Sequence, residues 1–271
     1  MARNVAPEVA AAHPLTVIKP HAGPRRRNVV FVRCGARSAH RRLYPLPSNR
    51  HWDCVLSCYE PAQAQDLEQA DCVMTGGVSK WDAFSQARFE HGELGLGDYE
   101  RFFLLDDDIE FQRAADIDRL FDIGREHQLA ICQASLTPQS FAAWAVTRRH
   151  DSWFLRFTNF VECMAPLFDA EAVRLLEQDI RAAVSGCGLD LIFRSVMGPQ
   201  RRMAVIDAVS VTHTQPVDPR NGRFYRYLRS IGVDHQEEIA WFLARHHMTN
   251  FGVTTLGGMP IVQHVYPPQA A

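Results

Sequence analysis

The stretch Phe102-Phe103-Leu104-Leu105-Asp106-Asp107-Asp108 joins a short apolar run to three consecutive carboxylates. Four apolar residues, two of them aromatic, are typical of a buried β-strand, and the more polar residues 99–101 lead into it. In open α/β sheets, ligands bind beyond the carboxyl ends of the strands. Because three adjacent carboxylates repel one another unless a cation joins them, the stretch predicts a strand of an α/β sheet with a binding site at its end.

The spacing of the acids favours a divalent metal ion. On an extended backbone, Asp106 and Asp108 point to one side and Asp107 to the other. A hard cation such as Mn²⁺ or Mg²⁺ binds carboxylate oxygens and keeps positions open for phosphate oxygens. The alternative is an acidic start to the helix predicted at residues 116–126, which would benefit from the helix dipole. This alternative is weakened because the triplet lies several residues before that helix.

The composition fits one large α/β domain, alone or with an appendage. The chain has 271 residues, of which 46% are hydrophobic, so a sizeable core is available. Its net charge of −2 creates no field that would recruit nucleic acid, and we expect no nucleic-acid partner. The basic clusters at residues 25–27 and 41–42 are more typical of solvated surface charge.

Cysteine usage and the start of the chain favour a cytoplasmic protein. The seven cysteines show neither a CxxC motif nor zinc-like spacing with histidine, so we expect small buried side chains in a reducing compartment. Residues 1–27 are rich in Ala, Pro and His and lack the apolar core of a signal peptide, which predicts a flexible lead-in. No apolar stretch is long enough to span a bilayer.

Apolar runs alternate with helical patterns along residues 28–218. We expect helices at 79–91, 116–126 and 170–184, and strands at the acidic stretch and at 28–33, 52–57, 71–75, 129–133, 160–168 and 203–212. Asp169 is placed to cap the third of these helices. Strands that alternate with helices imply a mostly parallel sheet covered on both faces.

Residues 219–271 differ in composition and are expected to form a C-terminal appendage. After Pro216 the chain becomes rich in Pro, Arg, Asn and Gly, and an aromatic, charged helix is then predicted over 224–247 with a break near Gly232. Its aromatic residues favour packing on the core over dimerisation or contact with a membrane face. The segment 249–271 is rich in Gly and Pro and is expected to be irregular.

Further polar residues lie at predicted strand ends. Arg33 ends the first strand, and Gly76-Gly77-Val78-Ser79-Lys80 combines two glycines that allow close approach with a helix cap and a lysine suited to a phosphate. A routine strand-to-helix turn explains this stretch equally well. His213 ends the last strand and is a plausible ligand for Mn²⁺. Neither GxGxxG nor GxxxxGK[ST] is present, which removes support for a dinucleotide or P-loop site.

Two acids stand out as candidates for proton transfer. Glu162 lies inside the apolar run 160–166, where a carboxylate is costly unless it is paired or functional. Asp190 follows the glycine turn 186–188 at the start of a predicted helix. It is suited either to capping that helix or to acting as a general base toward a substrate hydroxyl.

The order of these motifs resembles the glycosyltransferases of the GT-A fold, and in particular a little-characterised glycosyltransferase-like family that carries a DDD motif. The resemblance covers residues 28–216 and runs from the Arg33 strand through Gly-Gly-x-x-Lys, the DDD strand, Asn-Phe-Val-Glu and Gly-Leu-Asp to Val-Thr-His. It implies a sugar nucleotide bound across the first half of the sheet, with Arg33 and residues 76–80 facing the nucleotide.

The resemblance also implies roles for individual residues. Asp106 and Asp108 match the DxD positions, Asp108 as a direct metal ligand and Asp106 as a ligand of ribose or metal. His213 matches a later metal ligand, and Asp190 matches the base of inverting members. Arg220 and Arg223 match a flexible loop that closes on the diphosphate. One departure is Leu189, where many inverting members carry an acid.

The sequence therefore predicts a metal-dependent glycosyltransferase that moves a sugar from a nucleoside-diphosphate sugar to a glycan or other hydroxyl acceptor. Inversion follows if Asp190 is the base, and retention with Glu162 near the reacting face follows if it is not. One rival is a nucleotidyltransferase of related fold, for which Lys80 alone is well placed among the cations. The other is a non-catalytic sugar- or nucleotide-binding module. By analogy, polysaccharide biosynthesis with peripheral membrane association is a compatible setting.

Overall fold

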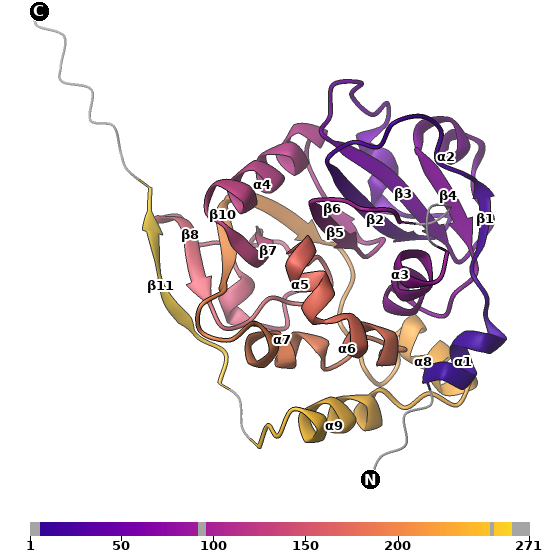
Figure 1. Ribbon diagram of the computed structural model, residues 1–271. Helices are drawn as coiled ribbons and strands as arrows, with labels where there is room; N and C mark the ends of the chain where they lie inside the picture. The colour runs from indigo at the N-terminus through magenta and orange to yellow at the C-terminus, as the bar shows by residue number, and fades with distance from the viewer. Residues whose placement is uncertain (1–5, 92–95, 250–251, 262–271) are drawn as a thin grey trace, which may run out of the picture.

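The strand that ends in the acidic triplet, β5 (Arg101–Leu105), lies in the middle of a mixed sheet (Figure 1). The computed structural model describes residues 6–91, 96–249 and 252–261. Within these residues the strand order is β1-β4-β3-β2-β5-β9-β7-β10-β8-β11, and β6 pairs with β10. The other strands are β1 (Thr16–Lys19), β2 (Asn28–Cys34), β3 (Trp52–Cys58), β4 (Cys72–Thr75), β6 (Ile109–Glu110), β7 (Leu129–Leu136), β8 (Trp153–Thr158), β9 (Leu167–Asp169), β10 (Arg202–His213) and β11 (Thr255–Pro260).

The centre of the sheet is largely parallel, as predicted. Strands β4, β3, β2 and β5 run parallel to one another, and β7 runs parallel to β10. The flanking helices are α1 (Ala6–Ala12), α2 (Ala64–Gln69), α3 (Lys80–Phe89), α4 (Ala114–Glu126), α5 (Ala170–Leu175), α6 (Glu177–Ala182), α7 (Leu189–Met197), α8 (Arg223–Ser230) and α9 (His235–Arg245). The chain is therefore an α/β protein with its parallel strand ends on one edge of the sheet.

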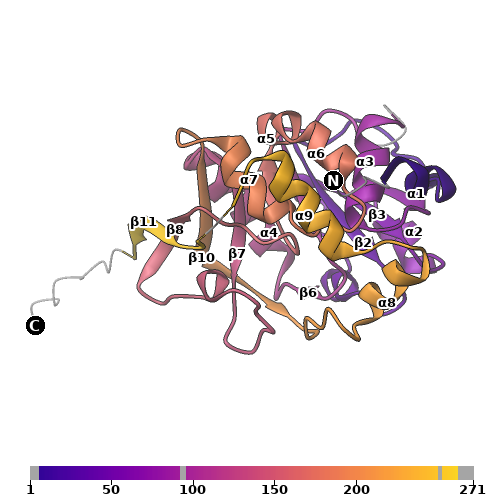
Figure 2. The ribbon, with the colours of Figure 1, turned by 90° about the horizontal axis from the view of Figure 1, so that it is seen from below.

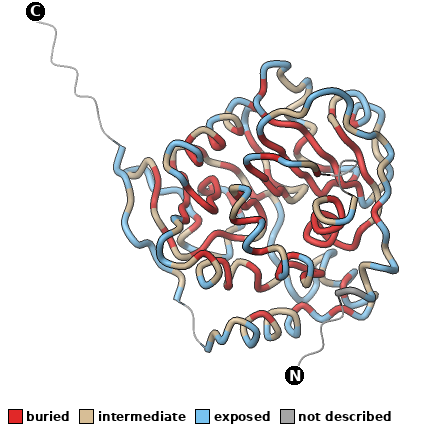
Figure 3. Tube along the Cα trace, viewed as in Figure 1, coloured by how far each residue is buried: buried red, intermediate tan, exposed pale blue. Residues whose placement is uncertain are grey.

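Helices cover both faces of the sheet, which makes the central strands apolar on both sides. In β5, Phe103 and Leu105 join the core beneath α4, whereas Phe102 and Leu104 join the core beneath α3, α5, α6 and α7. Successive side chains of a strand point to opposite faces, so a strand covered on both faces has an unbroken apolar run. The buried residues accordingly follow the central strands, while the outer turns are exposed (Figure 3). Helix α9 lies beside α7 (Figure 2).

Two predicted elements differ from the structure. Residues 160–166 form a loop, and only 167–169 are a strand, β9, which lies antiparallel between β5 and β7. In space, the loop lies alongside the end of β5, where Leu104 N–H donates to Pro166 O and Asp106 N–H donates to Met164 O. The helix predicted at 170–184 is two helices, α5 and α6, although Asp169 caps the first one as expected.

Segments on either side of residues 28–218 also contribute to the sheet. In the expected lead-in, β1 pairs with β4, and in the expected irregular tail, β11 pairs with β8. The irregular tail is thus wrong for 255–260, and residues 262–271 lie outside the described residues. The predicted helix break near Gly232 is confirmed, since α8 and α9 flank this glycine. Phe242 of α9 is fully buried in the core beside α7.

The remaining expectations concern charge, thiols and membrane spans. Arg26 is not free surface charge, because it pairs with Asp53 and Asp71. All seven cysteines are free, and five of them are buried. Among the described helices, none has both the length and the apolar character needed to cross a bilayer.

Candidate functional site

Lys80 holds the first carboxylate of the triplet in place. Its Nζ lies 2.8 Å from Asp106 Oδ1 and donates to the carbonyl oxygens of Cys163 and Met164 at 2.7 and 2.8 Å. Desolvation raises the pKa of Asp106 to about 6; Asp108 adds to the rise and Lys80 opposes it. Lys80 was predicted to face a phosphate, but here all three of its N–H donors are engaged by the protein. It fixes Asp106 against the 160–166 loop.

Asp108 and His213 form a pair at the ends of β5 and β10. His213 Nε2 lies 3.2 Å from Asp108 Oδ2, and His213 Nδ1 donates to Phe141 O at 2.6 Å. Burial lowers the pKa of His213, but the hydrogen bond and charge of Asp108 outweigh it and raise the pKa to about 9. The second oxygen of Asp108, Oδ1, is buried without a hydrogen-bond partner. A second ring nitrogen bonded to a carbonyl is typical of a metal-binding histidine.

These residues fit a divalent cation in part. A carboxylate oxygen that lacks a donor and an imidazole nitrogen beside it are ligands for ions such as Mn²⁺. Asp106 does not join them, since Asp106, Asp108 and His213 do not bring three ligand atoms within 4.8 Å of one another. Of the residues described, the group that does meet this criterion is His21, Asp53 and Asp71.

Asp107 has a different partner, although the triplet lies in a turn after the end of β5 and not on the extended backbone that was predicted. Tyr59 Oη donates a short hydrogen bond to Asp107 Oδ2. Glu60, which follows Tyr59 in the chain, pairs with Arg223 Nη2 at 2.6 Å. The start of α8 therefore reaches the loop after β3. Arg220 is exposed, and its backbone N–H donates to Asp218 Oδ1. Of the two predicted arginines, Arg223 is therefore the one that the structure brings to the strand ends.

Arg33 contacts Gly76 and Gly77, but other residues of the protein occupy the space next to these glycines. Arg33 Nη1 and Nη2 donate to Gly76 O and Gly77 O at 2.6 and 2.8 Å. Both glycines have positive φ, and a Cβ on Gly76 would lie 2.1 Å from Pro14 O. Gly77 N–H donates to His13 O. The turn thus needs glycine to accommodate the segment at residues 13–14, and Arg33 holds its carbonyls.

Glu162 is buried beside the triplet with an unsatisfied oxygen. The residue is 7% exposed, its Oε2 has no hydrogen-bond partner, and its backbone N–H donates to Gln133 Oε1 at 2.6 Å. Burial raises the pKa of Glu162 to about 8, with further contributions from Asp190 and Asp106. At neutral pH Glu162 is therefore mostly protonated.

Asp190 has a different protonation state. It lies in the first turn of α7, whose N-cap is Gly188, so Asp190 is not the capping residue. Burial raises the pKa of Asp190 to about 6, while backbone hydrogen bonds from Cys163 and Leu191 oppose the rise. Near neutral pH this site therefore holds an ionised Asp190 and a protonated Glu162. Separated pKa values of this kind are typical of acid and base roles.

Tyr225 of α8 was not predicted as a site residue, yet it lies near the acids. This tyrosine interacts electrostatically with Asp106, Glu162 and Asp190, and burial raises its pKa. Its ring centroid lies 4.7 Å from that of His235. The aromatic pattern of residues 224–247 was interpreted as core packing, which is correct for Phe242. Sequence spacing gave no signal that the preceding helix reaches the acids.

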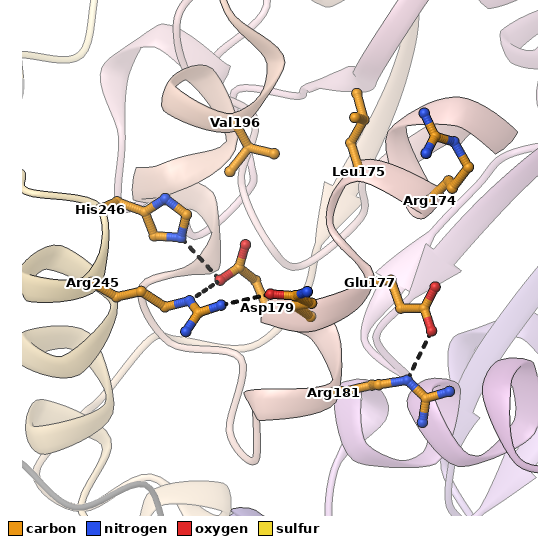
Figure 4. Close-up of a pocket in the computed structure, with 9 residues that line it drawn as sticks. Arg174, Leu175, Glu177, Asp179, Arg181, Val196, Arg245 and His246 are labelled. Atoms are coloured by element: carbon orange, nitrogen blue, oxygen red, sulfur yellow. Dashed lines mark hydrogen bonds and ion pairs between the residues drawn. The ribbon is translucent and has the colours of Figure 1, made fainter.

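A cavity lies on another part of the molecule, among the helices that follow β9. A space of about 660 Å³ is bounded by α5, α6, α7 and α9, and none of its lining residues was predicted for the site (Figure 4). Asp179 in its wall pairs with Arg245 and His246, and Glu177 pairs with Arg181. Because these charges are satisfied by one another, we assign the candidate site to the strand ends, where Asp108 and Glu162 keep unpaired oxygens.

No protein-family model and no curated protein matches this chain. Among solved structures, it is similar to GalNAc-T7 with UDP, GalNAc and Mn²⁺ at 10% identity and a TM-score of 0.51, covering 90% of this chain and 60% of that one. It is also similar to the mannosyltransferase PcManGT from Pyrobaculum calidifontis with GDP-Man and Mn²⁺, at 12% identity, TM-score 0.47 and coverage of 91% and 82%. For S. aureus TarS the identity is 14%, the TM-score 0.46 and the coverage 83% and 44%.

The similarity to GalNAc-T7 concerns the fold. At 10% identity, the shared feature is the α/β architecture with a largely parallel central sheet, and this is the GT-A type of fold predicted from the sequence. This chain spans 44% of the TarS chain and 60% of the GalNAc-T7 chain. The finer resemblance to the DDD-bearing family stays a prediction. The fold of this chain is that of the GT-A glycosyltransferases.

Proposed function

We propose that this chain is a metal-dependent glycosyltransferase that moves a sugar from a nucleoside-diphosphate sugar to a hydroxyl group of an acceptor such as a glycan. The observation that carries the proposal is the set of acids at the strand ends. Asp108 has a buried oxygen without a partner, and Glu162 and Asp190 differ in protonation state. The shared fold with GalNAc-T7, whose structure contains UDP, GalNAc and Mn²⁺, supports it.

Asp108 and His213 are the residues that would hold Mn²⁺ or Mg²⁺. The unpaired Oδ1 of Asp108 fits such an ion, because a buried carboxylate oxygen without a donor is otherwise costly. A bound divalent cation supplies charge neutralisation for a leaving diphosphate. Asp106, held by Lys80, is proposed to contact the ribose of the donor or the metal from outside the Asp108–His213 pair.

Asp190 is the proposed base and makes the reaction inverting. Its carboxylate accepts the proton of the acceptor hydroxyl while that oxygen forms a bond to the anomeric carbon. The bond from the same carbon to the diphosphate breaks, and the diphosphate leaves with the electron pair. The retaining alternative would need an ionised Glu162. Because the pKa of Glu162 is raised to about 8, this residue is better suited to donating a hydrogen bond at neutral pH.

The donor nucleotide is proposed to lie over the ends of β2, β3 and β5. Arg33 shapes this edge by holding Gly76 and Gly77, and Arg223 approaches it from α8. Arg220, in the turn before α8, is proposed to approach the diphosphate when the donor is bound. A nucleotidyltransferase would need a cation for a triphosphate, and Lys80 is already paired with Asp106.

The test is donor turnover across a panel of nucleotide sugars in Mn²⁺, Mg²⁺ or EDTA, on the wild type and on Asp190→Asn. We expect metal-dependent release of one nucleoside diphosphate and a loss of about 100-fold or more in Asp190→Asn. The matched control is Glu177→Gln, an exposed pair on α6, which should turn over like the wild type. Binding without turnover, with a full set of acceptors, would identify a non-catalytic module. No donor binding and no metal uptake would overturn the proposal.

A further inference from the structure

The loop that leads to Asp190 is compressed between two helices. Residues 183–188 connect α6 to α7, and Gly186 and Gly188 adopt φ values of 82° and 96°. A Cβ on Gly186 would lie 1.9 Å from Trp81 Cδ1 of α3, and one on Gly188 would lie 3.0 Å from Ile239 Cα of α9. The base loop, as we call residues 183–188, therefore has little room to move sideways.

A carboxylate from α9 binds the backbone of the base loop. Glu238 Oε1 accepts the N–H groups of Ser185 and Gly186 at 3.1 and 2.8 Å, and its Oε2 accepts Ser185 N–H at 2.9 Å. Hydrogen bonds to an ionised acceptor are stronger than those between neutral groups. Ser185 is 6% exposed, so without Glu238 its N–H would lose its acceptor in a site that water reaches poorly.

Two further elements hold the same loop from other sides. Ser79 Oγ, at the start of α3, donates a short hydrogen bond to Val184 O. Cys163 Sγ, one residue after Glu162, donates to Gly186 O at 3.4 Å. Of these three contacts, the one from Glu238 is made by a carboxylate and comes from the C-terminal segment. Burial raises the pKa of Glu238, and the backbone hydrogen bonds from Ser185 and Gly186 oppose that rise.

The position of the base loop sets the position of Asp190. Leu189 N–H donates to Gly186 O and Leu191 N–H donates to Gly188 O, both at 3.2 Å. These bonds start the first turn of α7, which contains Asp190. A displacement of the loop would thus shift the carboxylate with it, and a misplacement of about 1 Å costs about 100-fold in rate.

We propose that Glu238 is a positioning residue for the reaction proposed above: by accepting the N–H groups of Ser185 and Gly186 it fixes the base loop, and so places Asp190 against the acceptor hydroxyl. The inference rests on the proposed function. It makes the C-terminal segment part of the catalytic apparatus, since α9 acts on the base from outside the site.

The test compares Glu238→Gln with Glu237→Gln. The amide of Glu238→Gln keeps one acceptor oxygen and turns an N–H group toward a backbone N–H. Glu237 is the neighbouring exposed acid on the same helix, so its variant controls for lost charge on α9. Amide hydrogen exchange at residues 185–186 is measured together with kcat, the donor KM and the pH profile.

We expect faster exchange at residues 185–186 in Glu238→Gln, by about tenfold or more, with the other core amides unchanged. We also expect kcat to fall by about tenfold or more while the donor KM stays within about twofold, and the acid limb of the pH profile to shift. Glu238→Asp, which keeps the charge at shorter reach, should recover part of kcat. Glu237→Gln should match the wild type in each measurement.

Two results separate this inference from the proposed function. If Glu238→Gln is less stable but keeps the wild-type kcat and pH profile, Glu238 only supports the fold and the inference is overturned while the function stands. Unchanged exchange at residues 185–186 would overturn it as well. If the wild type turns over no donor, the proposed function itself fails, and the positioning role fails with it even if the loop exchanges faster.

Discussion

Two clusters of carboxylates lie at opposite ends of the parallel strands β3, β4 and β5, and they differ in how their charge is balanced. Asp53 and Asp71 lie at the amino ends of β3 and β4, near His21. Asp106 and Asp108 lie at the carboxyl end of β5, near Glu162 and Asp190. The first group meets the geometric criterion for a metal site and the second does not.

The amino-end cluster is fully neutralised by the protein. Asp53 is completely buried and accepts hydrogen bonds from His21, from Arg26 and from Tyr99 Oη at 2.7–3.0 Å. Asp71 accepts from Arg26, Arg50 and the backbone N–H of Cys54 at 2.7–2.9 Å. Arginine occupies the position that a metal ion would take, so the cluster is a structural ion-pair network.

The carboxyl-end cluster is balanced only in part. Lys80 pairs with Asp106, and His213 pairs with Asp108. One carboxylate oxygen of Asp108 and one of Glu162 nevertheless have no hydrogen-bond partner. Glu162 and Asp190 both have raised pKa values because burial disfavours their charge. The comparison shows that the cluster whose ligand atoms lie close together is the one whose carboxylates are paired with arginine, whereas the carboxyl-end acids keep two oxygens without a partner.

The largest effect is expected on stability, from Asp53→Asn. Removing the charge leaves Arg26 in a network built for two carboxylates, and breaking a buried ion pair costs about 3–5 kcal/mol in the free energy of unfolding. Urea unfolding measures this loss in the free energy of unfolding. The control is Asp98→Asn, whose side chain is 99% exposed and whose change should stay within about 0.5 kcal/mol. Equal effects of the two substitutions would show that the amino-end network is not structural.

Asp108→Asn should reduce donor turnover more than it reduces stability. Donor turnover is expected to fall by about 100-fold or more, because the proposed metal site loses its charged ligand. The free energy of unfolding should fall by less than in Asp53→Asn, because the Asp108 side chain is 21% exposed and the amide oxygen still accepts from His213, although the charged partner of His213 is lost. Metal titration, donor turnover and urea unfolding report on this. A large loss of stability with unchanged turnover would show that Asp108 supports the fold and takes no part in the reaction.

The pH dependence of turnover follows from Asp190. A base must be ionised, so turnover should be constant above a pH of about 6 and fall about tenfold for each pH unit below it. Because the folded-state pKa is raised, the stabilising contribution of Asp190 is present at low pH and is lost as the pH rises through 6. Asp190→Asn should therefore be at least as stable as the wild type at pH 7. Turnover that peaks at pH 4 would exclude Asp190 as the base.

The smallest effect is expected from Arg223→Ala. The Arg223 side chain is 70% exposed, and surface ion pairs contribute about 0–1 kcal/mol to the free energy of unfolding. We expect the donor KM to rise a few-fold with kcat nearly unchanged, because the guanidinium assists binding of the diphosphate from the rim of the site. Initial-rate kinetics distinguish this from a loss of kcat above about tenfold, which would place Arg223 among the groups that act on the transition state.

Local patterns in the sequence predicted the elements that local physics determines. The apolar run of β5, the strands predicted at 28–33 and 52–57, the cap at Asp169 and the break near Gly232 all follow from residues close together in the chain. The alternation of strands and helices also predicted the α/β fold. The loop at 160–166 was mistaken for a strand because its apolar residues are buried against β5, and periodicity does not separate a buried loop from a buried strand.

The partners of the charged groups were decided by the tertiary structure. Lys80 contacts Cys163 across 83 residues of sequence, and Glu238 contacts Ser185 across 53. Spacing along a chain places no constraint on such pairs, because they depend on how separate segments pack. The sequence by itself determined which residues end the central strands. Only the tertiary structure decided which carboxylate oxygens near those ends have hydrogen-bond partners and which have none, because these partners come from segments far apart in the chain.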